Sequence, residues 1–163
     1  MKKILLAAVL VVSVACVGNA GTLGAYGEWL GGVWCGGVGG GVAIDVAPMT
    51  IKAGAHYNLA SGINFGGGVK YPLPIPLANN LTLSVDGEFH IALAGLTSFL
   101  FWEVPIMGVV EYKLADNMSV YGGGGVTIYP TYTASINWTT LSLTLVPTVG
   151  FTYNYVAGVG YKF

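Results

Sequence analysis

The chain has 163 residues, of which 54% are hydrophobic, only 8% are charged and 26 are glycine. Soluble domains carry about 25% charged residues, so this is not the composition of an ordinary soluble domain. The net charge is −1 and all six basic residues are lysines, which provides no basic surface for nucleic acid, and the high apolar content excludes a disordered chain. The composition therefore indicates a membrane protein with a single domain.

The beginning of the chain has the pattern of an export signal. Two lysines follow Met1, an apolar run then extends to Val17, and residues 18–20 provide the small side chains that signal peptidase reads. The apolar run is too short to span a membrane as a helix. We therefore expect a cleaved signal peptide over residues 1–20 and one domain over residues 21–163.

The two cysteines do not form a disulfide or metal-binding pattern. Cys16 lies inside the expected signal peptide. A cut directly before it would instead produce a lipoprotein, although the aliphatic residue that usually stands three positions earlier is missing. Cys35 is then alone, and a single thiol forms neither an internal disulfide nor a metal-ligand cluster. No cofactor is expected.

Apolar and polar residues alternate with a period of two along most of the remaining chain, which predicts β-strands. In chain order the clearest alternation covers residues 51–57, 63–71, 81–93, 102–112 and 149–163. Turn signals lie at residues 31–32, 47–48, 60–62, 72–80, 94–97 and 115–117, with weaker ones at 130–131, 137–140 and 153–154. All of these turns together give ten strands, and a smaller set gives eight. Apart from a longer loop expected over residues 129–140, the connections should be short.

The charged residues show which face of the sheet is which. Those that can be placed on a strand have the parity opposite to that of the aromatic and aliphatic residues. A soluble β-sandwich needs a charged exterior, for which about ten strand charges are too few, whereas a membrane barrel turns its apolar residues to lipid and its charges to the lumen. An open sheet in lipid would leave backbone groups unpaired, so the sheet must close. We predict an all-β fold: a closed antiparallel transmembrane β-barrel of 8 to 10 strands in an up-and-down meander.

The last strand carries the most specific signal. It ends Val159-Gly160-Tyr161-Lys162-Phe163, with an apolar residue at every second position before the final aromatic residue. Together with the export signal, the alternation and a tight turn predicted within residues 112–120, this resembles the small outer-membrane β-barrels of Gram-negative bacteria, the size class of outer-membrane proteins X and W. The resemblance implies that the protein resides in the bacterial outer membrane, with lipid as a partner. It also implies that the outer-membrane insertion machinery reads Tyr161 and Phe163 as an assembly signal. It defines a class of protein but no activity.

The predicted lumenal side chains form a charged network. Side chains fill the interior of a barrel this narrow, and buried charges need partners. Asp86, Glu88 and His90 share one face of one strand and could hold a metal or act as acid and base, but ion pairing is the role we expect. Six acids face four lysines, so charge balance requires a protonated His90 or a carboxyl group that keeps its proton. The predicted members are Glu28, Asp45, Lys52, His56, Lys70, Asp86, Glu88, His90, Glu103, Glu111, Lys113 and Lys162.

The sequence leaves three kinds of role open. We expect a structural or surface-interaction barrel with a plugged, narrow lumen. The alternatives are a narrow, porin-like channel for small or apolar solutes and a lipid-modifying barrel enzyme. Enzymatic chemistry is disfavoured because both histidines are predicted to face the lumen and not the lipid-facing rim. The glycine-rich run at residues 36–41 has no lysine after it and is interpreted as part of a strand, not as a nucleotide loop.

Overall fold

The computed structural model describes residues 21–33, 35–59, 61–93, 100–137, 139–140 and 142–163. The expected signal peptide and Cys16 lie outside the described residues. The strands are β1 (Thr22–Leu30), β2 (Gly37–Val46), β3 (Met49–Asn58), β4 (Gly62–Pro72), β5 (Leu81–Leu93), β6 (Leu100–Ala115), β7 (Met118–Asn137) and β8 (Ser142–Lys162). In the described part of the chain there is no helix long and apolar enough to cross a membrane.

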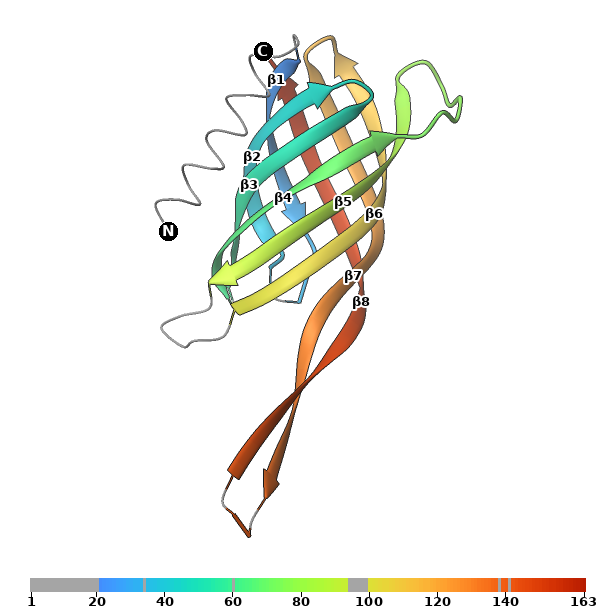
Figure 1. Ribbon diagram of the computed structural model, residues 1–163. Coiled ribbons are helices and arrows are strands. Elements are labelled where there is room, and N and C mark those ends of the chain that lie inside the picture. Colours follow the sequence, from blue (N-terminus) through green and yellow to red (C-terminus); the bar gives the residue numbers. More distant parts are fainter. Residues whose placement is uncertain (1–20, 34, 60, 94–99, 138, 141) are drawn as a thin grey trace.

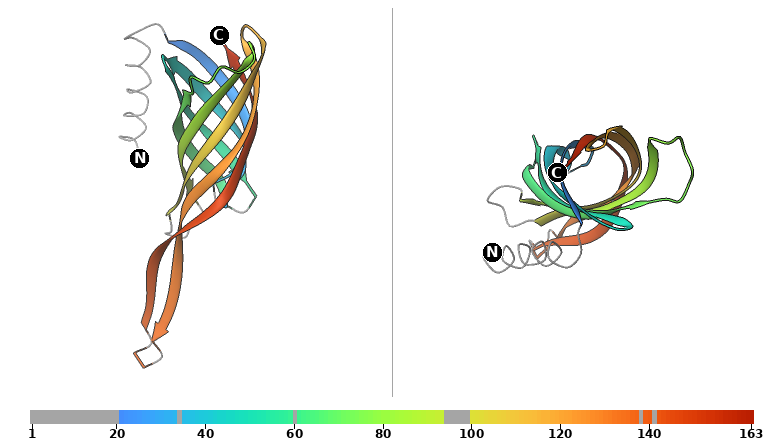
Figure 2. Two further views of the ribbon diagram at one scale, coloured as in Figure 1. Left: turned by 90° about the vertical axis from the view of Figure 1, so that its right-hand side faces the viewer. Right: turned by 90° about the horizontal axis from the view of Figure 1, so that it is seen from above.

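The strands form a closed ring. Each strand pairs with its neighbour in sequence, and β8 pairs antiparallel with β1 from Gly24↔Lys162 to Leu30↔Val156, as Figure 1 and the view from above in Figure 2 show. The predicted closed antiparallel meander is therefore confirmed, with eight strands.

Two of the weaker turn signals, at residues 130–131 and 153–154, are wrong, and so is the loop expected over residues 129–140. β7 and β8 pair without interruption from Met118↔Tyr161 to Asn137↔Ser142. Pro130 is tolerated within β7 because a proline nitrogen that faces away from the partner strand removes no hydrogen bond from the ladder. The predicted turn at residues 137–140 is present, where the Asn137 side chain accepts hydrogen bonds from the backbone N–H groups of Thr139 and Thr140 at 3.0 and 3.2 Å.

The two ends of the barrel differ. The C-terminus, the start of β1 and the connections β2–β3, β4–β5 and β6–β7 lie at one end, which we call the terminal end (Figures 1 and 2). The β7–β8 hairpin projects far beyond the barrel at the opposite end, which we call the hairpin end.

The side chains are arranged inside out relative to a soluble protein. Outward-facing apolar residues are exposed, for example Val38 at 69%, Tyr57 at 57% and Phe65 at 53%, whereas the inward-facing Glu28 and Lys52 are 4% and 5% exposed. Charged side chains are almost never fully buried in soluble domains unless they are paired. The barrel therefore has an apolar outer surface and a charged interior.

Candidate functional site: the charged lumen

A single ammonium group bonds three carboxylates in the middle of the lumen. The Lys52 Nζ on β3 lies 3.1 Å from Glu28 Oε2 on β1 and 3.1 Å from Asp86 Oδ2 on β5, and it also bonds Glu88 Oε1 on β5. All four side chains are at most 5% exposed. Because these residues come from different sides of the ring, their ion pairs bridge the lumen. We call these four residues the Lys52 cluster.

Both histidines extend the Lys52 cluster. His56 Nε2 lies 3.1 Å from Glu28 Oε1, His90 Nε2 lies 2.5 Å from Glu88 Oε2, and the two rings lie 5.2 Å apart between centroids. With neutral imidazoles, three carboxylates face one lysine. These formal charges sum to −2, and the protonated His90 or protonated carboxyl group expected from the sequence stays a prediction.

Glycines on the intervening strands bring these partners together. Lys52 is registered with Gly68 of β4, which is registered in turn with Glu88. In the same way, Glu28 and His56 lie on either side of Gly39. A Cβ added at Gly68 would lie 2.6 Å from Glu88 Cγ, and one added at Gly39 would lie 2.7 Å from His56 Cδ2. The Lys52–Glu88 and Glu28–His56 bonds thus each cross one intervening strand, at a glycine where a side chain would be in the way.

Two tyrosines complete the Lys52 cluster, and sequence reasoning missed them. The Tyr121 hydroxyl donates to Glu28 Oε2 at 2.5 Å, and Lys52 Nζ lies 4.7 Å from the centroid of the Tyr26 ring. Aromatic residues were expected on the outer face, but Tyr26 has the same parity as Glu28, and Tyr121 the same parity as the buried Ser119. Parity was the signal that could have found both.

The lumen also has an apolar part that the sequence analysis did not anticipate. Leu30, Met107, Val109 and Val156 form a buried cluster, against which Tyr121 packs. Glu103 is buried as well, at 2% exposure. The interior therefore contains packed apolar side chains in addition to the Lys52 cluster.

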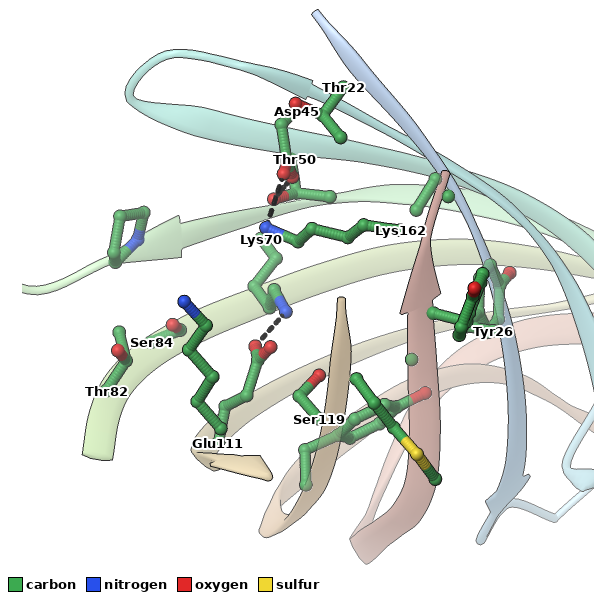
Figure 3. Close-up of a pocket in the computed structure, with 18 of the residues that line it drawn as sticks. Thr22, Tyr26, Asp45, Thr50, Lys70, Thr82, Ser84, Glu111, Ser119 and Lys162 are labelled. Atoms are coloured by element: carbon green, nitrogen blue, oxygen red, sulfur yellow. Dashed lines mark hydrogen bonds and ion pairs between the residues drawn. The ribbon is translucent and has the colours of Figure 1, made fainter. Parts of the chain in front are cut away.

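At the terminal end the lumen opens into a cavity of about 580 Å³, which we call the cup (Figure 3). Two ion pairs lie on its wall: Lys70 with Glu111, and Lys162 Nζ with Asp45 Oδ2 at 2.6 Å. Lys52 and Asp86 also line the cup. Since both belong to the Lys52 cluster, that cluster forms the floor.

Lys113 does not join the buried network. Its side chain is 55% exposed and lies 3.3 Å from Asp116 Oδ1, in the turn that follows β6. The alternation gave Lys113 its inward parity, but it lies two residues from the end of β6, where the chain leaves the lumen.

The carboxylates of the Lys52 cluster are bonded to a lysine and are not grouped as metal ligands. No group of three or more His, Cys, Asp or Glu side chains among the described residues is arranged to hold a metal ion. In the middle of the lumen, the Lys52 ammonium already occupies the space between the three carboxylates. The described Cys35 is buried and carries a free thiol.

The fold matches solved outer-membrane proteins. Outer membrane protein H (OprH) from P. aeruginosa superposes with a TM-score of 0.52 at 15% identity, covering 89% of this chain and 100% of that one. A major outer membrane protein from Thermus thermophilus gives a TM-score of 0.46 at 12% identity, covering 89% and 100% of the two chains. Neisserial surface protein A gives 0.39 at 11% identity, covering 88% and 96%. Neither protein-family models nor curated protein sequences match the chain. The likeness to OprH shows that this chain has the fold of the small bacterial outer-membrane β-barrels, as the sequence resemblance implies.

Proposed function

We propose that the protein is an integral outer-membrane β-barrel that acts through its bulk and its exposed surface, with a lumen that is plugged and does not conduct. The observation that carries this proposal is the Lys52 cluster, whose ion pairs join β1, β3 and β5 across the interior. The apolar outer surface supports placement in lipid, because large exposed apolar surfaces are unfavourable in water.

The plug is expected to be stable. Removing one partner of a buried ion pair typically costs about 3–5 kcal/mol, because the other charge is left buried and uncompensated. Moving Lys52 aside to admit an ion would remove the ammonium from Asp86, and it would leave Glu28 and Glu88 with only their hydrogen bonds to His56, Tyr121 and His90.

A narrow channel is the second candidate, and the cup favours it. A cavity of about 580 Å³ at the terminal end would admit small solutes, which would then have to displace the Lys52 cluster to pass. We expect no lipid-modifying activity, because both histidines are buried inside the barrel and bonded to carboxylates.

Cell fractionation combined with electrophoresis tests this proposal. The full chain, expressed in a Gram-negative host, should appear in the outer-membrane fraction with a mature N-terminus at Gly21. It should also migrate differently before and after boiling, as folded barrels do. Recovery in the soluble periplasmic fraction, or identical mobility in both samples, would refute the proposed location. Hosts that express the wild type, Glu88→Gln or His90→Ala should all have the same membrane lipid composition. A change in lipid composition that the wild type causes and the variants do not would instead establish a lipid-modifying enzyme.

A further inference from the structure

The β7–β8 hairpin continues beyond the barrel as an isolated two-stranded ribbon. Pairing between β6 and β7 ends at Val104↔Ile128, and pairing between β8 and β1 ends at Leu30↔Val156. The ribbon consists of residues 129–137 and 142–150, which pair from Tyr129↔Gly150 to Asn137↔Ser142. Figures 1 and 2 show it leaving the hairpin end of the barrel. Two strands alone are only marginally stable in water. We therefore expect the ribbon to pack against another surface.

The two faces of the ribbon differ in chemistry. Residues 131–137 read Thr-Tyr-Thr-Ala-Ser-Ile-Asn, an alternation of hydroxyl or amide residues with apolar ones. On the apolar face, Tyr132, Ile136 and Val149 are 43%, 50% and 57% exposed. On the other face, the hydroxyls of Thr131 and Thr148 bond each other across the two strands, and Val146, 48% exposed, is the apolar exception on this face.

The apolar face of the ribbon continues the apolar outer surface of the barrel. Tyr132 and Ile136 have the same strand parity as Val126, which is exposed on the outside of the barrel, and Val149 has the same parity as the exposed Tyr155. The hydroxyl face continues the lumenal side in the same way. If lipid covers the outside of the barrel, the same surface extends along β8 onto the ribbon through Phe151 and Tyr153, which are 68% and 90% exposed, whereas Pro130 on β7 is buried.

Charge is absent from this whole part of the chain. Between Asp116 and Lys162 the sequence has no Asp, Glu, Lys, Arg or His. The ribbon therefore has no charged group that could form an ion pair with a protein surface or a lipid headgroup. It can enter the membrane interface without the cost of desolvating a charge.

The dimensions and the edges of the ribbon disfavour a second copy as the occupant. A face nine residues long and two strands wide covers about 30 by 10 Å, or about 300 Å², whereas a stable interface buries about 800 Å² on each partner. Edge pairing is also obstructed. The Tyr155 carbonyl accepts a bond from Gly31 on the β1 side, so the nitrogen of Pro147, eight residues earlier, faces that same edge, where no described strand pairs with the ribbon. A proline nitrogen cannot donate to an added strand.

We propose that the ribbon is an amphipathic membrane-surface element whose apolar face, containing Tyr132, Ile136 and Val149, lies against the membrane surface at the hairpin end of the barrel while its hydroxyl face points to water. This inference rests on the proposed membrane location of the barrel. Tyrosine, with an apolar ring and a polar hydroxyl, suits the interface at this depth. The ribbon would then enlarge the footprint of a narrow barrel on the membrane surface.

Site-directed fluorescence in phosphatidylcholine vesicles tests the proposal. In the chain from Gly21 on, the single cysteine, Cys35, is buried, so a polarity-sensitive probe reports from an introduced cysteine. The matched pair is Ile136→Cys and Ser135→Cys, neighbours on opposite faces of the ribbon, and Ile51→Cys on the outer face of β3 reports on the barrel. Each protein is first checked for its mobility shift on heating, which shows that it has folded.

Lipid carrying a spin-label quencher should quench the probe at Ile136 at least twofold more than the probe at Ser135, and aqueous iodide should show the reverse order. Equal, iodide-accessible probes at both ribbon positions would overturn the proposal, since the ribbon would then stand free in water. A probe at Ile136 that is shielded from both quenchers would also overturn it, in favour of contact between copies of this chain. If the Ile51 probe is not quenched by the lipid label, the proposed membrane barrel itself fails, so the two failures are distinguishable.

Discussion

Replacing Lys52 with methionine should destabilise the barrel strongly. The substitution keeps an unbranched side chain of similar length but removes the ammonium that bonds Glu28, Asp86 and Glu88. Breaking a buried ion pair costs about 3–5 kcal/mol. Because Glu28 and Glu88 keep their hydrogen bonds to His56 and His90, we expect the lower end of this range, about 3 kcal/mol.

Urea unfolding in detergent micelles, followed by the gel mobility of the folded form, measures this loss. Lys113→Met is the matched control, because that lysine is 55% exposed and pairs only with Asp116 in its own turn, so its midpoint should equal that of the wild type. Adding Glu88→Gln to Lys52→Met should recover part of the lost stability, since one of the uncompensated charges is removed. If Lys52→Met unfolds at the same urea concentration as the wild type, the Lys52 cluster does not support the barrel and our reasoning is wrong.

Three further predictions follow from the wall of the barrel. The Phe163 N–H donates to the Leu23 carbonyl at 2.9 Å, next to the seam between β8 and β1. Deleting Phe163 should leave export intact but remove the protein from the outer membrane. Normal outer-membrane levels on an immunoblot would contradict its role in assembly. Val85→Arg, near the middle of β5 on the outer face, should cost about 2–4 kcal/mol in a refolding titration into vesicles. Ile63→Arg, next to the first residue of β4, should cost about 0–1 kcal/mol. Equal costs would show that depth in lipid does not matter here. Gly68→Ala should lower the urea midpoint, because its Cβ would lie 2.4 Å from the Gly87 carbonyl oxygen and 2.6 Å from Glu88 Cγ, whereas Gly87→Ala, which meets nothing within 4 Å, should not. Similar midpoints for the two variants would show that the barrel wall and the lumen can adapt.

The fold was largely predictable from the sequence because lipid and lumen impose opposite demands on alternate residues. In a narrow barrel each strand has one apolar and one polar face, and this period of two is visible without knowing the register. The number of strands was less clear. Pro130-Thr131 and Tyr153-Asn154 look like turn residues in sequence, but both lie within the uninterrupted pairing of β7 and β8. A proline whose nitrogen faces away from the partner strand removes no ladder hydrogen bond.

The contacts of the candidate site were less predictable, because they depend on register and on glycine. Lys52 and Glu88 lie 36 residues apart in sequence, on strands that are not neighbours, and they meet only because Gly68 lies between them. The alternation of apolar and polar residues placed Lys52 and Glu88 on the same side of the sheet, but it could not show that they form an ion pair. Tyr26 and Tyr121 were missed for a related reason, since an aromatic residue fits either face of a membrane strand and only its parity shows which one it occupies.

The plugged lumen is the central claim, and ionic conductance of the wild-type protein in planar lipid bilayers tests it most directly. Insertion is first confirmed by the mobility shift of protein recovered from the vesicles that are fused to the bilayer. With the Lys52 cluster intact across the interior, we predict a baseline without unitary current steps at neutral pH. Reproducible stepwise conductance from inserted wild-type protein would contradict the account and establish the barrel as a channel.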